Sequence, residues 1–200
     1  MPYNPEKHHR RSMRLKGYDY SAAGAYFITL CTYQRQCLFG EIMDGAMHLN
    51  PYGKIVEEEW MQSSTIRQEI ELDGWVIMPD HMHGIVMITH HDISARAHGR
   101  VPPQQYLPPP SAPPPFGPKP YAPPLCIPPR KPQSISSFMA GFKSAATKRI
   151  NILRDTPRTP VWQRNYHERI IRDESALSNI RRYIQMNPIN WKSDRFHGGN

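Results

Sequence analysis

The chain has 200 residues, 38% of them hydrophobic, and its formal charge is +8 at pH 7 with a pI near 9.5. This length allows one domain with a hydrophobic core, and no apolar run approaches the roughly 18 residues that a membrane-spanning helix needs. The three cysteines, Cys31, Cys37 and Cys126, are odd in number and lack paired spacing, which argues against a disulfide framework and a cysteine-based zinc site. We therefore expect a soluble cytoplasmic protein without a membrane partner.

The basic charge favours a polyanionic partner, with nucleic acid ahead of an anionic membrane surface. Residues 1–20 form a basic N-terminal arm that lacks the apolar core of a signal peptide. Arg10, Arg11 and Arg14 in this arm could neutralise phosphates, although a solvated tail would have the same composition.

Residues 25–33 are rich in aromatic and β-branched side chains and predict a strand at the centre of a sheet. Asn50 followed by Pro51 is typical of a helix start, and apolar residues at helical spacing extend this helix to about Gln62. Its three consecutive acids, Glu57 to Glu59, spread around the helix, so we expect them to face solvent.

Residues 70–78 predict the next strand, which leads through a Pro79-Asp80 turn into a partner strand that ends near Ile88. Both faces of this partner strand are apolar beyond Gly84, which is typical of a strand in the middle of a sheet. The order of elements up to this point is strand, helix, strand, strand.

The partner strand begins with a His-x-His pair, His81 and His83. Side chains alternate faces along a strand, so these two should point the same way about 6.6–6.8 Å apart, while Met82 points oppositely. Two imidazoles placed in this way can share one metal ion. The alternative is a pair of hydrogen-bonded histidines at a strand end, and a metal site would need further ligands from elsewhere in the chain.

Between Pro102 and Pro132, fifteen of thirty-one residues are proline. Proline removes backbone donors, so neither a continuous helix nor a sheet ladder can form there. We expect an extended, Pro-rich inserted loop over residues 90–133. It could bind nucleic acid or a Pro-recognising partner, or it could be a spacer without a function of its own.

Regular structure is predicted again from Ser134, with apolar residues at steps of three and four that indicate a helix of about five turns. Lys143, Lys148 and Arg149 lie elsewhere on this helix and form a candidate phosphate-facing surface, or alternatively a solvated face. A loop containing Arg164 then leads into a strand that ends near residue 171.

Asp173 can cap a final helix, which should end near Asn187 because Pro188 prevents its continuation. Tyr183 and Asn187 are four residues apart and so lie on one face of this helix. The side-chain oxygen of Asn187 suits a hard divalent cation and could complete a site with the two histidines. Taken singly, a tyrosine beside an apolar stripe is a packing residue, and an asparagine before proline ends a helix.

Three stretches together resemble the single-tyrosine HUH transposases, most closely the REP-associated tyrosine transposases. They are the segment from Trp75 to Gly84, the segment from Val161 to Arg172, and Tyr183-Ile-x-x-Asn187-Pro188. The resemblance implies an α+β fold over residues 1–200, with a ferredoxin-like βαββαβ core, an antiparallel sheet and an additional C-terminal helix that carries the nucleophile. The long Pro-rich insertion is not part of the family core.

Carried over residue by residue, the resemblance implies that His81 and His83 bind a divalent metal ion, Mg²⁺ or Mn²⁺. Tyr183 matches the nucleophile. Asn187 matches a polar ligand one helical turn beyond it, where better-known relatives have glutamine, whose side chain is one methylene longer.

The activity implied is that of a transposase-type endonuclease and strand transferase. Such an enzyme cleaves single-stranded, hairpin-containing DNA through a 5′-phosphotyrosine intermediate, and it would be associated with the nucleoid. Relatives include monomers and dimers, so a homodimer stays open. The alternatives are a DNA-binding regulator of the same fold without cleavage and an unrelated metal-dependent hydrolase. The candidate DNA-binding residues are Arg10, Arg11, Arg14, Lys143, Lys148, Arg149, Arg164, Arg181 and Arg182.

Overall fold

The computed structural model describes residues 17–89 and 132–191. The predicted phosphate contacts of Arg10, Arg11 and Arg14 lie outside these residues, as does nearly all of the predicted Pro-rich loop. Within the described residues, the fold is a mixed α+β arrangement built on an antiparallel sheet, in agreement with the sequence-based expectation.

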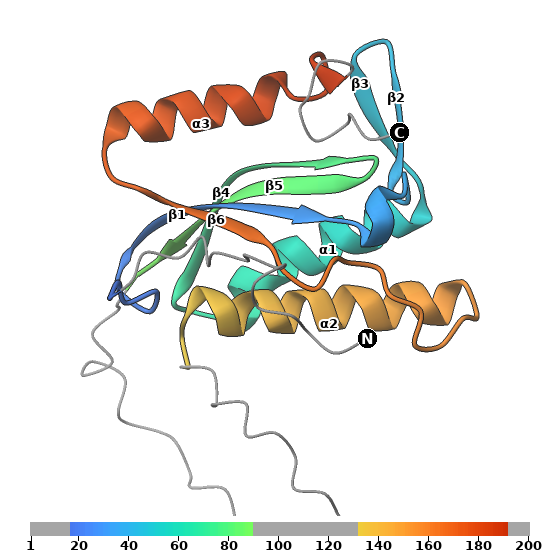
Figure 1. Cartoon of the computed structure of the whole chain (residues 1–200), viewed down its shortest axis with the longest axis horizontal. Coiled ribbons are helices and arrows are strands. Elements are labelled where there is room, and N and C mark those ends of the chain that lie inside the picture. Colours follow the sequence, from blue (N-terminus) through green and yellow to red (C-terminus); the bar gives the residue numbers. More distant parts are fainter. Residues whose placement is uncertain (1–16, 90–131, 192–200) are drawn as a thin grey trace, which may run out of the picture. The chain divides into compact units, whose positions relative to one another are not determined.

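The main sheet has four strands, β1 (Gly24–Cys31), β4 (Ile70–Met78), β5 (His81–Ile88) and β6 (His167–Ile171). Their order in the sheet is β4-β5-β1-β6, and every neighbouring pair is antiparallel. The two strands that were expected at the centre, β1 and β5, do lie between the others. Helices α1 and α2 cover one face of this sheet and α3 covers the other (Figure 1).

The three helices begin at the polar residues that the sequence indicated. The Asn50 side chain accepts hydrogen bonds from two backbone N–H groups at the start of α1 (Pro51–Ile66). Ser134 forms a reciprocal capping box at α2 (Ile135–Leu153), and Asp173 accepts from Ala176 N at α3 (Glu174–Met186). Helix α1 continues four residues beyond the predicted end at Gln62, because the backbone continues to hydrogen-bond as far as Arg67 N, after the apolar pattern has stopped. None of the described helices combines the length and apolar character needed to cross a membrane.

A small hairpin of β2 (Gly40–Met43) and β3 (Ala46–Leu49) was missed in the sequence. Its strands have four residues each, too few for a clear alternation of apolar side chains. The signal that could have found it is the Asp44-Gly45 turn, in which both residues have positive φ, 50° and 75°. Asp-Gly with positive φ at both positions is characteristic of two-residue hairpin turns. The hairpin lies beside the C-terminal end of α3 (Figure 1).

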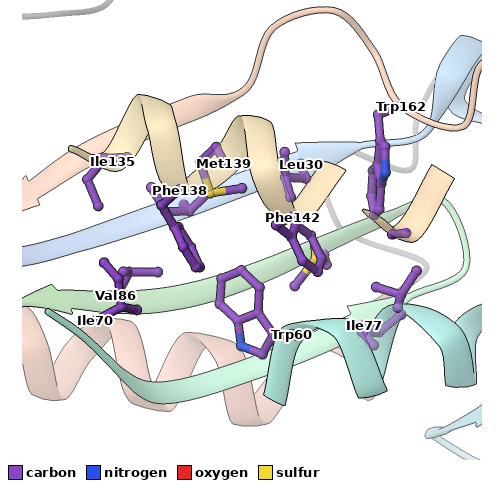
Figure 2. Packing of buried hydrophobic residues seen from close by; sticks show 14 of the residues in the cluster. Leu30, Trp60, Ile70, Ile77, Val86, Ile135, Phe138, Met139, Phe142 and Trp162 are labelled. Carbon is purple, nitrogen blue, oxygen red and sulfur yellow. The ribbon is translucent and has the colours of Figure 1, made fainter. Parts of the chain in front are cut away.

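The larger hydrophobic core lies between the sheet and helices α1 and α2, and Trp60 is at its centre (Figure 2). The fully buried indole packs edge-on against Phe138 and Phe142 of α2, with ring centroids 5.6 Å and 5.1 Å away. On its other side Trp60 lies against Gly84 of β5, where an added Cβ would be only 2.5 Å from Cζ2 of the indole. Gly84 therefore allows the closest contact between this core and the strand that carries both histidines.

We predict that Gly84→Ala lowers the free energy of unfolding by about 1–3 kcal/mol, because the new methyl group overlaps a ring that is enclosed on all sides. Urea denaturation followed by circular dichroism measures this change. Gly141→Ala is the matched control, since an added Cβ at Gly141 meets nothing within 4 Å and alanine favours the helix by up to ~1 kcal/mol. Equal effects of the two substitutions would contradict the packing role of Gly84.

Candidate functional site

The two histidines project from β5 toward α3, on the opposite face of the sheet from Trp60. Both imidazole rings are fully buried, and their Nε2 atoms are 3.1 Å apart. The side chains thus converge as the His-x-His spacing predicted. Met82, between them, points into the larger core instead.

Each ring is held by a hydrogen bond at its other nitrogen. Nδ1 of His81 donates to Oδ1 of Asp80 at 2.6 Å, and Nδ1 of His83 is hydrogen-bonded to Oγ1 of Thr29 at 2.8 Å. Thr29 is directly opposite His83 in the register of β1 and β5. Since Nδ1 of His81 faces the carboxylate, Nε2 is the ring nitrogen that faces His83.

Asp80 is itself fixed on several sides. Its Oδ2 accepts from Nε of Arg35 at 3.0 Å, and its backbone oxygen accepts from both the N–H and the hydroxyl of Thr32 at 2.9 Å. The sequence indicates Asp80 only as a turn residue, and it predicts no role in the site for Arg35 or Thr29. The position of Asp80 directly before His81 is a signal that the sequence does contain. The position of Thr29 depends on strand register, and that of Arg35 depends on a loop in which Gln34 and Arg35 have positive φ.

Tyr183 reaches this pair from α3. Its hydroxyl is 3.2 Å from Nε2 of His83. The ring of Phe27, on β1, stacks on His83 at 5.3 Å and meets Tyr183 edge-on at 6.1 Å, which restricts both side chains. Tyr183 is 39% exposed although both imidazoles are buried, so this residue lies at the margin of the site.

Asn187 lies at the C-terminal end of α3 and is almost fully buried, and its backbone N–H donates to the oxygen of Ile184. The helix ends there, as the following proline indicated. Trp191, four residues further on, stacks on His81 with ring centroids 5.8 Å apart and was not anticipated from the sequence. The segment that follows α3 therefore covers His81 through Trp191.

The chemistry of these side chains fits a divalent cation. Among residues 17–89 and 132–191, no group of three or more His, Cys, Asp or Glu side chains is arranged to hold a metal ion. The candidate set here consists of two imidazole nitrogens and one amide oxygen instead. The carboxylate and hydroxyl at the Nδ1 atoms are the outer partners that orient metal-binding histidines in proteins.

The structure separates the predicted DNA-binding residues that it describes into a group that lines a groove, a group paired with carboxylates, and Arg182, which is exposed. Lys143, Lys148 and Arg164 line one groove of about 470 Å³, formed by α2 and residues 160–164. Lys143 also donates to the backbone oxygens of Gln163 and Arg164, at 2.6 Å and 3.0 Å. Because α2 and α3 cover opposite faces of the sheet, this groove and Tyr183 are on different sides of the molecule's main sheet.

The other group has carboxylate partners. Arg149 forms ion pairs with Glu58 and Glu59 of α1, so these two acids do not simply face solvent as expected. They raise the pKa of the Arg149 guanidinium by hydrogen bonding. Arg181 is bound to Asp73 of β4, and Arg182 is exposed on α3. Arg149 and Arg181 therefore have structural roles that the charge pattern did not reveal.

Comparison with solved structures shows that this fold is similar to that of a REP-associated tyrosine transposase. The structure of such a transposase bound to a REP hairpin covers 90% of this chain and 74% of that one, with a TM-score of 0.54 and 17% sequence identity. This similarity confirms the resemblance inferred from the three motifs, at the level of the fold.

At the sequence level, the chain is 36% identical over 198 residues to an uncharacterized protein of Haemophilus influenzae. The alignment covers 98% of this chain and 97% of the relative. The chain belongs to the same family as that protein. No protein-family model matches it.

We predict that Thr29→Val destabilises the fold by about 1–2 kcal/mol, because it removes the hydroxyl from a buried imidazole nitrogen while keeping the shape of the side chain. Unfolding in urea provides the measurement. Thr65→Val is the matched control, since Thr65 is exposed on α1 and valine and threonine have similar helix propensities. A loss no greater than in this control would show that the Thr29 hydrogen bond does not hold His83.

Proposed function

We propose that this protein is a transposase-type DNA endonuclease and strand transferase with Tyr183 as its nucleophile. The observation that carries the proposal is the position of the Tyr183 hydroxyl, 3.2 Å from Nε2 of a histidine that converges with a second histidine at 3.1 Å. A tyrosine hydroxyl beside two imidazoles of fixed orientation is suited to phosphodiester cleavage. The exposed fraction of Tyr183 supports a polymeric substrate rather than an enclosed small molecule.

His81, His83 and Asn187 would hold the divalent cation, Mg²⁺ or Mn²⁺. When bound, such an ion supplies positive charge that offsets the developing charge on a non-bridging phosphate oxygen. The protein contributes the orientation of its ligands, through Asp80 and Thr29, and the exclusion of water by Phe27 and Trp191. The assignment of Asn187 as the third ligand rests on the Tyr183-Ile-x-x-Asn187-Pro188 motif and on the burial of Asn187 at the end of α3.

In the proposed reaction, the oxygen of Tyr183 attacks phosphorus while the bond to the 3′ oxygen breaks on the opposite side. The tyrosine loses its proton and the departing 3′ oxygen gains one, so the products are a 5′-phosphotyrosine and a free 3′-hydroxyl. The covalent intermediate retains a phosphodiester, which now joins the tyrosine to the 5′ end of the DNA. Attack by another 3′-hydroxyl reverses the step and joins new strands, which is strand transfer.

Single-stranded DNA with a hairpin is the proposed substrate. The solved structure with a similar fold is of a protein bound to a REP hairpin. In this chain Lys148 and Arg164 give the groove positive charge that could bind a DNA backbone. Ser144 and Thr147, which carry hydroxyl groups, also line this groove. Its separation from Tyr183 would allow one part of the DNA to be held while another reaches the nucleophile.

The order of the elements supports a particular domain architecture. Apart from the β2–β3 hairpin, the order is β1-α1-β4-β5-α2-β6, and the sheet order is β4-β5-β1-β6. Both support a ferredoxin-like core followed by α3 as the nucleophile helix. We propose one HUH domain with a basic arm at its N-terminus and the Pro-rich loop inserted between β5 and α2.

The central test uses labelled single-stranded hairpin oligonucleotides with Mg²⁺ or Mn²⁺ and a denaturing gel. We predict a covalent protein–DNA adduct that is lost in Tyr183→Phe, because the attacking oxygen is absent, and in His81→Ala. Tyr33→Phe is the matched control, since Tyr33 is 41% exposed, close to the value for Tyr183, and lies outside the proposed site.

An adduct that persists in Tyr183→Phe would overturn the assignment of the nucleophile. Hairpin binding without any adduct over a broad panel of oligonucleotides would favour the alternative, a DNA-binding regulator with this fold.

We further predict that Lys148→Gln and Arg164→Gln each weaken hairpin binding and lower the slope of log affinity against log salt by about 0.7–0.9, the value for one phosphate contact. Lys54→Gln, which removes the same charge from an exposed position on α1, is the control. Fluorescence anisotropy at several salt concentrations measures the slope. Unchanged slopes in both groove variants would exclude this groove as the DNA-binding surface.

A further inference from the structure

Helix α3, which carries Tyr183, rests on the sheet through a narrow apolar stripe. Ile180 and Ile184 of this helix are buried in the apolar cluster, and Ala176 and Leu177 pack beside them partly buried. Successive residues of a helix are separated by about 100°, so Arg181 and Tyr183 project on opposite flanks of this stripe. A helix held along a narrow line can roll about its axis, and contacts on the two flanks determine its rotation.

The contact on the first flank is an ion pair with β4, the edge strand of the sheet. Nε of Arg181 is 3.1 Å from both carboxylate oxygens of Asp73, and its second terminal nitrogen is 2.6 Å from Oδ2. A weaker contact of 3.5 Å joins Arg181 to Glu174 on the same helix. The contact on the second flank is the approach of Tyr183 to His83 described above.

A β-bulge in the edge strand produces this geometry. The register between β4 and β5 shifts between Leu72 and Trp75, so Asp73 and Gly74 together lie opposite the single residue Ile85. Bulges of this kind redirect a side chain away from its regular alternation. Gly74 then lies directly beneath α3, where an added Cβ would be 3.9 Å from Cγ of Arg181 and from Cδ1 of Ile184. The N–H of Gly74 also donates to Oδ1 of Asp73 at 2.6 Å.

We propose that Asp73 is a positioning residue for the nucleophile: by binding Arg181 it sets the rotation of α3 at which the Tyr183 hydroxyl meets His83. This inference rests on the proposed function for its catalytic consequence. The hydrogen bonds from Arg181 lower the pKa of the Asp73 carboxyl, so the pair is fully charged at neutral pH. Asp73 touches no reacting group itself, and its effect passes entirely through the helix.

The substitution that tests this is Asp73→Asn, which leaves every cationic side chain, Arg181 included, in place. We expect the rate constant of adduct formation at saturating hairpin DNA to fall about tenfold or more, because small misplacements of a nucleophile are costly. The half-saturating DNA concentration should stay within about twofold, since no DNA contact is removed. Asp73→Glu keeps the carboxylate and should restore part of the rate.

A second measurement does not depend on activity. Hydrogen–deuterium exchange followed by mass spectrometry should show several-fold faster exchange in residues 174–186 of Asp73→Asn, with β1 and β5 unchanged. Glu71→Gln is the control, because it removes the same charge from an exposed position on the same strand.

Adduct rates and α3 exchange equal to those of Glu71→Gln would overturn the proposal. A change in half-saturation without a change in rate would overturn it too, because Asp73 would then act on binding. If the unmodified protein forms no adduct, the proposed function fails, and the exchange measurement alone decides whether Asp73 fixes α3.

Discussion

Two hydrogen bonds at imidazole Nδ1 atoms, from His81 to Asp80 and between His83 and Thr29, are the interactions on which the candidate site depends. They determine which way each buried ring faces, and so they bring both Nε2 atoms to one point. Without them the His-x-His spacing would supply only two side chains on the same side of a strand. Strand pairing supplies Thr29 and the hairpin turn supplies Asp80, so both orienting contacts come from the sheet and its turn and not from α3.

The sheet divides the molecule into two regions with different physical demands. On the face covered by α1 and α2, Trp60 and the phenylalanines of α2 form a closely packed core, and Gly84 allows the indole to touch β5. On the other face, α3 is held by a small apolar cluster together with polar contacts. The first face stabilises the strand that carries the histidines, while the second leaves Tyr183 partly exposed. One face of the sheet thus holds the histidine-bearing strand in a packed core, and the other face leaves the tyrosine accessible to solvent.

Much of the fold could be predicted from local patterns. The four strands of the main sheet, the starts of all three helices and the central positions of β1 and β5 follow from alternation, capping residues and apolar runs, which depend on neighbours in the chain. The β2–β3 hairpin escaped because its strands are short. The His-x-His pair and the conjunction of Tyr183 with Asn187 also followed from spacing, and together with the segment from Val161 they indicated the transposase resemblance that the fold comparison confirms.

The residues that could do the chemistry, and the elements on which they lie, follow from residue type and from periods of two or about 3.6 residues. The partners that these residues meet depend on the tertiary structure. Asp80 orients His81, Thr29 holds His83, and Trp191 covers the first histidine. Arg149 and Arg181 have carboxylate partners, so their charge alone could not show whether a phosphate or a protein side chain would pair with it. Asp80 and His81 are adjacent in the sequence, but the other pairs are 54 to 110 positions apart, and no local pattern specifies such contacts.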